Sequence, residues 1–191
     1  FGLEQAIVVR SPTGEAIGQA AAELLLYQVK PEGIIGFGWS RTVSELAPYV
    51  TPKDSVCNCT IVDLIGTMIG TANPYSVSGK VADILHGTLL PLAVPMMVSS
   101  QEAADTLLEE SSIAAAMNAA RNSHVAFIGV GEVGPESTLV NMGKVSHERM
   151  ADLQRAGVVG EMLMRYFDIN GNHIEKEEDE RIIGLGWDDL H

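Results

Sequence analysis

The segment with the clearest chemical potential is Gly36-Phe37-Gly38-Trp39-Ser40-Arg41-Thr42, which follows a run of apolar residues. Gly36 and Gly38 let the backbone turn sharply, so that successive N–H groups point toward one spot. Ser40 and Thr42 add hydroxyl donors, and Arg41 adds a planar cation that suits phosphate oxygens. A helix beginning here would add a positive partial charge. The pattern predicts a phosphate-binding loop, although a strand–helix turn capped by Ser40 has the same residues.

A second glycine-rich segment, Gly129-Val130-Gly131-Glu132-Val133-Gly134, matches Gly-x-Gly-x-x-Gly. A dinucleotide site needs a helix to begin within that motif, but Pro135 and the residues after it continue as a loop. No acidic residue closes a following strand about 20 residues further on, as such a site requires. The motif therefore argues against NAD. It predicts a close backbone approach to a smaller ligand at Gly129 and Gly131.

Carboxylate and amide side chains are candidates to contact ligand hydroxyl groups. Glu161 lies in an apolar stretch after two glycines, and its oxygens accept hydrogen bonds from sugar hydroxyls. An exposed place on the polar side of a helix is the alternative for Glu161. Asn73, before Pro74, either reaches the same site or caps its helix. Four histidines stand singly, without an acid or nucleophile at a suitable spacing, so we expect structural and not catalytic roles for His86, His124, His147 and His173.

Composition narrows the function further. The chain has 191 residues, is 46% hydrophobic and carries a formal net charge of −13, which suits one domain, or at most one and a half. The acidic excess disfavours direct contact with nucleic acid or an anionic membrane. No apolar run is long enough to span a membrane, and no signal peptide follows Phe1, so we expect a cytoplasmic protein. Cys57 and Cys59 predict reduced thiols, and no zinc spacing or cofactor motif is present.

Alternating strand and helix patterns predict the elements that position these residues. Strand patterns cover residues 6–9, 33–38, 60–65, 89–98, 124–131 and 181–186. Helix patterns cover residues 15–29, 41–49, 75–86, 101–110 and 112–122, and another helix starts at Ser146. Pro91 and Pro95 confine the strand 89–98 to an edge. The acidic run 175–180 predicts a solvated loop.

Near-continuous apolar strands between helices are typical of an α/β fold. They predict a mostly parallel, doubly wound sheet with helices on both faces. Ligands bind at the carboxyl ends of the strands in such sheets. Three predicted strands end in glycine, at Gly38, Gly66 and Gly129, so we expect a binding crevice there.

Several segments resemble the SorC-type family of sugar-binding transcriptional regulators. The loop 36–42 is similar to the family's Gly-x-Ser/Gly-Trp-Gly/Ser-x-Thr loop, and 126–131 to its Val-Gly-Ile-Gly strand. The most specific match is 156–171, which resembles Gly-Ala-Val-Gly-Asp/Glu-Ile-x-x-x-Phe-Phe-Asp-x-x-Gly. The opening residues 1–9 fit the start of the family's effector domain. The matches are collinear and cover almost the whole chain.

The resemblance implies a fold related to sugar-phosphate isomerases and deaminases. It implies a non-enzymatic effector-binding and oligomerisation domain over residues 1–191, assembling as a homodimer or homotetramer. A helix-turn-helix that binds operator DNA would precede this chain, and the last part of the domain would follow it. The implied phosphate contacts are Gly36, Gly38, Ser40, Arg41 and Thr42. The implied sugar contacts are Gly66, Asn73, Gly129, Gly131 and Glu161.

Two departures from the family pattern bear on ligand binding. The chain has Ile65-Gly66-Thr67 where many members carry Gly-Gly, and it stops at His191, before a segment that helps to hold the ligand. The alternative function is a sugar-phosphate isomerase or deaminase on the same fold. Such an enzyme needs a base, for which Glu161 or Glu132 would be the candidates, but neither has a visible acid partner.

Overall fold

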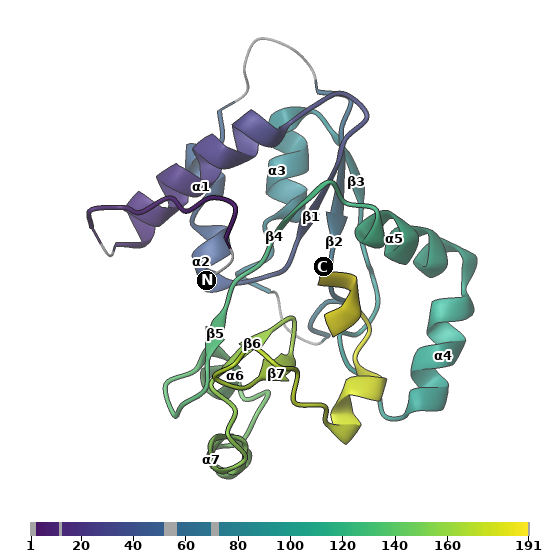
Figure 1. Ribbon diagram of the computed structural model, residues 1–191. Helices are drawn as coiled ribbons and strands as arrows, with labels where there is room; N and C mark the ends of the chain where they lie inside the picture. The colour runs from purple at the N-terminus through teal and green to yellow at the C-terminus, as the bar shows by residue number, and fades with distance from the viewer. Residues whose placement is uncertain (1–2, 12, 52–56, 70–72, 191) are drawn as a thin grey trace.

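A four-stranded parallel sheet forms the centre of the computed structural model, which describes residues 3–11, 13–51, 57–69 and 73–190. Its strands, in spatial order, are β3 (Thr88–Leu90), β2 (Thr60–Asp63), β1 (Ile34–Phe37) and β4 (Val125–Phe127) (Figure 1). Each neighbouring pair is parallel, and Ile35 lies opposite both Ile61 and Val125. The predicted mostly parallel α/β fold is therefore confirmed.

One face of this sheet is covered by α1 (Gly14–Gln28) and α3 (Ser78–Leu85). Successive side chains of a strand point to opposite faces, and Ile35 and Phe37 both point to this one. Leu25 of α1 belongs to the same cluster, and its side chain is fully buried, as is that of Ile35. The helix predicted over residues 15–29 is confirmed as α1.

The opposite face is covered by α4 (Gln101–Glu109) and α5 (Ser111–Arg121), which Figure 1 shows on the far side of the sheet from α1. Met117 of α5 packs in one cluster with Val62 of β2. Helices therefore lie on both faces, as predicted for a doubly wound sheet.

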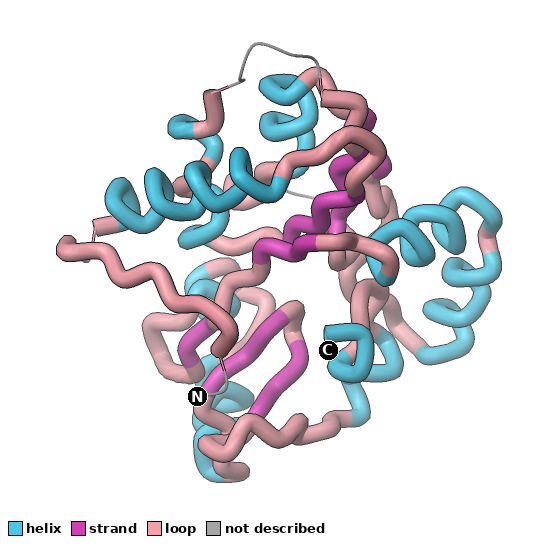
Figure 2. Tube along the Cα trace, turned by 45° about the horizontal axis from the view of Figure 1, so that its top comes forward, coloured by secondary structure: helices cyan, strands magenta, loops and turns pink. Residues whose placement is uncertain are grey.

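A three-stranded antiparallel sheet, separate from the first, forms a second unit (Figure 2). Its strands are β5 (Gly131–Glu132), β6 (Gly160–Met162) and β7 (Arg165–Phe167). The helices of this unit are α6 (Thr138–Asn141) and α7 (His147–Arg155). The sequence patterns did not predict this sheet, because strands of two or three residues are too short to show an alternation of apolar and polar residues.

The predicted strand at residues 6–9 is wrong, since the structure has no strand there and the Val8 side chain is 90% exposed. Ala6-Ile7-Val8-Val9 is rich in β-branched residues, which fit a pleated, half-buried surface. No described strand lies beside this segment to form backbone hydrogen bonds with it. Its β-branched residues therefore do not form a strand.

Three other predicted elements are shorter in the structure than the sequence patterns indicate, two of them at a proline. The helix expected over 41–49 divides into α2 (Arg41–Ser44) and η1 (Ala47–Tyr49), with Pro48 in the first turn of η1. The expected strand 89–98 ends at Leu90, just before Pro91, and β3 is an edge strand as predicted. The expected strand 181–186 forms only isolated bridges, from Ile182 to Met97 and from Gly184 to Ile65.

The C-terminal acidic run and the cysteines also have defined places. Part of the run forms η2 (Glu177–Arg181), and the Asp179 side chain is only 10% exposed, so the prediction of a solvated loop is wrong here. The last turn is η3 (Trp187–Leu190).

Cys57 and Cys59 are buried free thiols, and burial raises the pKa of Cys59 to about 12. None of the described helices is both long and apolar enough to cross a membrane.

Candidate functional site

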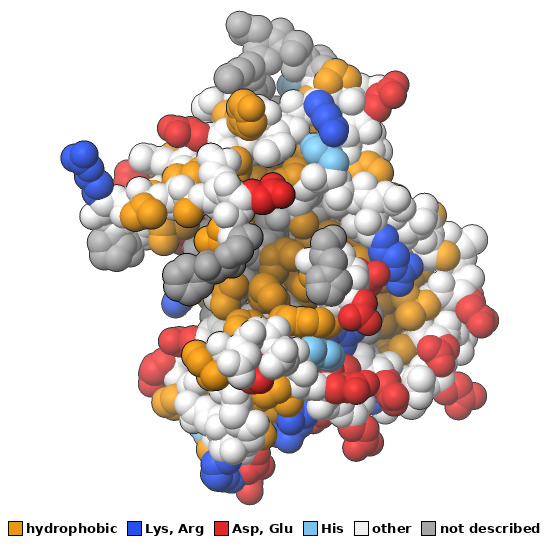
Figure 3. Space-filling view, in the orientation of Figure 1, with side chains coloured by type: hydrophobic (Ala, Val, Ile, Leu, Met, Phe, Trp, Pro, Cys, Tyr) orange, Lys and Arg blue, Asp and Glu red, His pale blue; other side chains and the backbone are white. Residues whose placement is uncertain are grey.

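A cavity of about 270 Å³ opens where β1 and β4 end and the antiparallel sheet begins. Its wall combines residues 39–42 after β1, residues 129–132 after β4, and Glu161, Leu163 and Met164 of the β6–β7 hairpin. In Figure 3 this face is hollowed between the parallel-sheet body and the antiparallel unit, and hydrophobic side chains gather in the hollow. The cavity lies at the carboxyl ends of parallel strands, where the fold class predicts a binding crevice.

The segment after β1 brings three of the predicted phosphate contacts to the cavity. Ser40 caps α2, because its Oγ accepts a 3.5 Å hydrogen bond from the Val43 N–H. Arg41 and Thr42 follow in the first turn, line the cavity and are exposed. Arg41 forms no ion pair with any residue that the structure describes. Its guanidinium therefore keeps its full capacity to bind an anion.

The glycines of the second motif make room for side chains of the cavity wall. A Cβ at Gly129 would overlap the Ser40 hydroxyl, and one at Gly131 would overlap the Glu161 carboxylate. A strand, β5, begins at Gly131, where a dinucleotide motif would begin a helix. The two glycines thus allow Ser40 and Glu161 to approach the backbone closely, and the geometry required for NAD is absent from this motif.

Glu161 reaches the cavity from β6, an antiparallel strand, and not from the polar side of a helix. Its Oε2 accepts a 3.0 Å hydrogen bond from the Met164 N–H across the hairpin turn. Burial raises the pKa of Glu161, and the Met164 hydrogen bond partly offsets that rise. A partly desolvated carboxylate forms stronger hydrogen bonds than one in water, so Glu161 is suited to hold hydroxyl donors.

The remaining predicted contacts lie apart from the cavity. Gly66 and Asn73 line a neighbouring hollow of about 20 Å³, where the Gly66 N–H donates to the Ile183 carbonyl over 2.8 Å. Asn73 accepts a hydrogen bond from Tyr75 N–H in the turn before α3, whose N-cap is Val77, so Asn73 does not cap this helix.

Gly36 lies in β1 and Gly38 directly after it, so these two predicted phosphate contacts are placed apart from the other three. Gly36 is part of β1, and Gly38 N–H donates to Phe127 O over 2.9 Å. Neither glycine lines the cavity. Gly36 pairs with both neighbouring strands, and the Gly38 N–H extends the pairing toward β4.

Sequence reasoning missed several residues at the cavity. Trp39 lines both hollows, and its indole N–H is buried without a hydrogen-bond partner among the described residues. Ser137 and Thr138, in a segment expected to be a loop, also line the wall. The signal for Trp39 was its place beside Ser40, whereas nothing in the sequence indicates that residues 137–138 fold back to this point.

Asp63, at the end of β2, was not singled out from the sequence. It accepts hydrogen bonds from Ser78 Oγ over 2.5 Å and from Leu92 N–H over 3.3 Å, and it lines the smaller hollow. Burial raises the pKa of Asp63, against the lowering effect of the Ser78 and Leu92 hydrogen bonds. These contacts tie β2 to α3 and to the segment after β3, so Asp63 has a structural role beside the site.

Comparison with known proteins identifies the family. The model of the Sugar-bind family, described as "Putative sugar-binding domain", matches residues 1–191. The transcriptional regulator YjhU of Escherichia coli is 28% identical over 200 residues, covering 97% of this chain and 60% of the relative. The erythritol catabolism regulatory protein EryD of Brucella abortus is 26% identical, covering 84% of this chain and 52% of the relative. This chain therefore spans about half to two thirds of the length of these relatives.

Solved structures show the same fold. The full-length sorbitol operon regulator SorC of Klebsiella pneumoniae superposes with a TM-score of 0.89 at 21% identity, covering 100% of this chain and 64% of that one. The probable sor operon regulator of Shigella flexneri gives a TM-score of 0.87 at 21% identity, covering 99% and 77%. The match over residues 1–191 shows that the chain belongs to the Sugar-bind family, and the superpositions show that it has the fold of these SorC-type regulators.

Proposed function

We propose that this chain is the effector-binding domain of a transcriptional regulator of sugar metabolism, and that its effector is a phosphorylated sugar. The observation that carries this proposal is the placement of Arg41 and Glu161 on one cavity wall. A guanidinium binds phosphate by charge-assisted hydrogen bonds, and a carboxylate accepts hydrogen bonds from hydroxyl groups. The two side chains therefore suit opposite ends of one ligand.

The phosphate would lie against the side chains of Ser40, Arg41 and Thr42, which are contiguous in the chain and line the cavity. The sugar would extend along Gly129 and Gly131 toward Glu161. The absence of side chains at both glycines supports this arrangement, because it lets Ser40 and Glu161 pack close to the backbone at the cavity wall, where both would contact the ligand.

Regulation would require a second part of the protein. The chain carries a net charge of −13, whereas operator DNA is bound mainly through Lys and Arg. Relatives named as transcriptional regulators are longer than this chain, which supports a separate DNA-binding domain. Effector binding would shift the assembled homo-oligomer between two states that differ in DNA affinity.

Phosphorus NMR tests the ligand class directly. The protein is mixed with aldose, ketose and alditol monophosphates of five and six carbons, and each sample is followed for several hours. We expect one sugar phosphate to shift or broaden without a new resonance. A new product resonance at catalytic protein concentration would instead show an isomerase or deaminase, with Glu161 or Glu132 as its base.

A parallel titration with unphosphorylated alditols, followed by saturation-transfer proton NMR, separates the two effector classes. Some relatives are named for erythritol and sorbitol, which carry no phosphate. Binding of the alditol alone, with no response from its phosphate, would contradict the phosphate assignment and leave the sugar-binding function in place.

A further inference from the structure

The turn between β6 and β7 has an unusual backbone. Leu163 and Met164 both have positive φ, at 50° and 64°, although neither is glycine. A hairpin turn of this kind is normally built from Asn-Gly or Gly-Gly, because a side chain is disfavoured at positive φ. Such a conformation persists only where surrounding contacts hold it.

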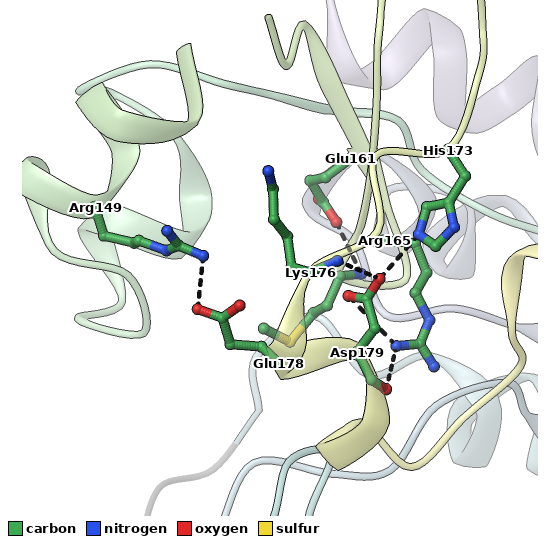
Figure 4. Close-up of polar contacts among 8 residues, drawn as sticks. Arg149, Glu161, Arg165, His173, Lys176, Glu178 and Asp179 are labelled. Carbon is green, nitrogen blue, oxygen red and sulfur yellow. Dashed lines mark hydrogen bonds and ion pairs between the residues drawn. The ribbon is translucent and has the colours of Figure 1, made fainter. Parts of the chain in front are cut away.

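The turn is held on its cavity side by Glu161. The Glu161 carboxylate accepts the Met164 N–H over 3.0 Å, and the Leu163 and Met164 side chains are buried in the cavity wall. This contact closes the turn across the hairpin, so the position of the carboxylate and the conformation of the turn depend on each other (Figure 4).

The turn is held on its other side by Arg165, the residue directly after Met164. The Arg165 side chain is 7% exposed, and its Nη1 donates to the Asp179 carbonyl over 2.7 Å. The same nitrogen lies 3.7 Å from the Asp179 carboxylate. A buried guanidinium needs such partners, because isolated burial of a charge is strongly unfavourable.

Asp179 is itself held by two further contacts. Its Oδ2 accepts the Lys176 N–H over 3.2 Å and lies 3.0 Å from His173 Nε2. The His173 ring stacks on Trp187, with ring centroids 5.3 Å apart. These contacts place Asp179 of the C-terminal segment beside Arg165 (Figure 4).

We propose that Arg165 and Asp179 are positioning residues, which hold the β6–β7 turn so that the Glu161 carboxylate faces the cavity. Neither needs to touch a ligand. Their ion pair links the cavity wall to the C-terminal segment, so a change at either end is transmitted through the turn. The positioning role concerns the free protein, and only its consequence for sugar affinity rests on the proposed function.

Amide hydrogen exchange at Met164, measured by NMR on the free chain, tests the proposal. The amide of Leu64, which donates to Phe37 O over 3.0 Å within the parallel sheet, serves as the reference for global opening. In Arg165→Met we expect Met164 exchange to accelerate at least about tenfold relative to Leu64, because the turn opens locally. Arg165→Lys, which keeps the charge, should restore part of the protection.

Arg149→Met provides the matched control. Arg149 forms a 2.7 Å ion pair with Glu178, close to Asp179 in the chain, but both side chains are about one third exposed. This variant should leave Met164 exchange within about twofold of wild type, as expected for a partly exposed pair that holds no strained backbone. Equal acceleration in Arg149→Met and Arg165→Met would overturn the proposal.

A double variant separates positioning from stability, and it also applies if Arg165→Met alone fails to fold. Arg165→Met with Asp179→Leu removes both buried charges, which often restores stability. We expect Leu64 protection to recover while Met164 stays fast. Recovery of both amides would show that the ion pair only stabilises the fold. Failure of the sugar-phosphate titration would count against the proposed function and leave this measurement unaffected.

Discussion

The parallel sheet and the antiparallel sheet bury different kinds of side chain. In β1 and β2, Ile35, Ile61 and Val62 are fully buried aliphatic residues. In β6 and β7, buried or half-buried positions hold Glu161, Arg165 and Tyr166. Burial raises the pKa of Tyr166 to about 12. Apolar burial is non-directional, whereas buried charges need specific partners.

Because of this difference, the two sheets contribute to the protein in different ways. The parallel sheet provides a frame whose stability comes from area removed from water. The antiparallel sheet places the Glu161 carboxylate at the cavity, and its buried charges have partners in the hairpin turn and in the C-terminal segment. Substitutions in the parallel sheet should therefore change stability, and substitutions of exposed polar residues at the cavity should change binding more than stability.

The largest effect is expected in the frame. Ile61→Ala removes a fully buried side chain of β2 that packs in one cluster with residues of α1 and α3, and should lower the unfolding free energy by about 2–5 kcal/mol. Urea denaturation measures this change. Ile169→Ala, at a position 81% exposed, is the control and should change stability by less than about 0.5 kcal/mol. Similar losses of unfolding free energy in both variants would contradict the conclusion that burial in the parallel sheet provides the stability.

Gly131→Ala should have the next largest effect, because the new methyl group would overlap the Glu161 carboxylate. We expect a loss of about 1–3 kcal/mol in unfolding free energy and a displaced Glu161. Gly134→Ala is the matched control within the same motif, since the nearest atom to its methyl group would be Gln154 Nε2, at 3.9 Å. If both variants behave like wild type, Gly131 does not make room for Glu161.

Arg41→Ala and Thr42→Ala test ligand binding at the cavity separately from the stability of the fold. Each should weaken binding of the effector sugar phosphate at least about tenfold, since one charge-assisted hydrogen bond contributes roughly 1.5–3 kcal/mol. Isothermal titration calorimetry measures the affinity, and denaturation should show stability close to that of wild type. Arg155→Ala, at an exposed arginine of α7 away from the cavity, is the control. Unchanged affinity in both cavity variants would exclude the phosphate site.

The smallest effect is a pH dependence at Glu161. Burial raises its pKa, so the folded chain holds this proton more strongly than the unfolded chain. The free energy of unfolding therefore falls as pH rises from the ordinary glutamate range through the raised pKa. Glu161→Gln removes this titration, so its stability relative to wild type should rise across that window in urea denaturation at a series of pH values. Glu175→Gln, at an exposed site, should show a constant offset.

The amino-acid sequence by itself determined the frame. Runs such as Ile34–Phe37 and Thr60–Asp63 alternate with helical patterns, and this order suffices for a parallel sheet covered on both faces. It also indicated Arg41 and Glu161 from their residue types. The strand predicted at 6–9 failed because β-propensity takes effect only where a partner strand is present.

Tertiary structure alone decided how these residues meet. Residues 39–42 and Glu161 are separated by more than half of the chain, and no local pattern encodes their approach to one cavity. The positive φ angles of Leu163 and Met164 also contradict local preference, and they persist through contacts with Glu161 and through the Arg165–Asp179 ion pair. Local sequence sets periodicity and propensity, whereas the placement of a polar site depends on long-range contacts between side chains.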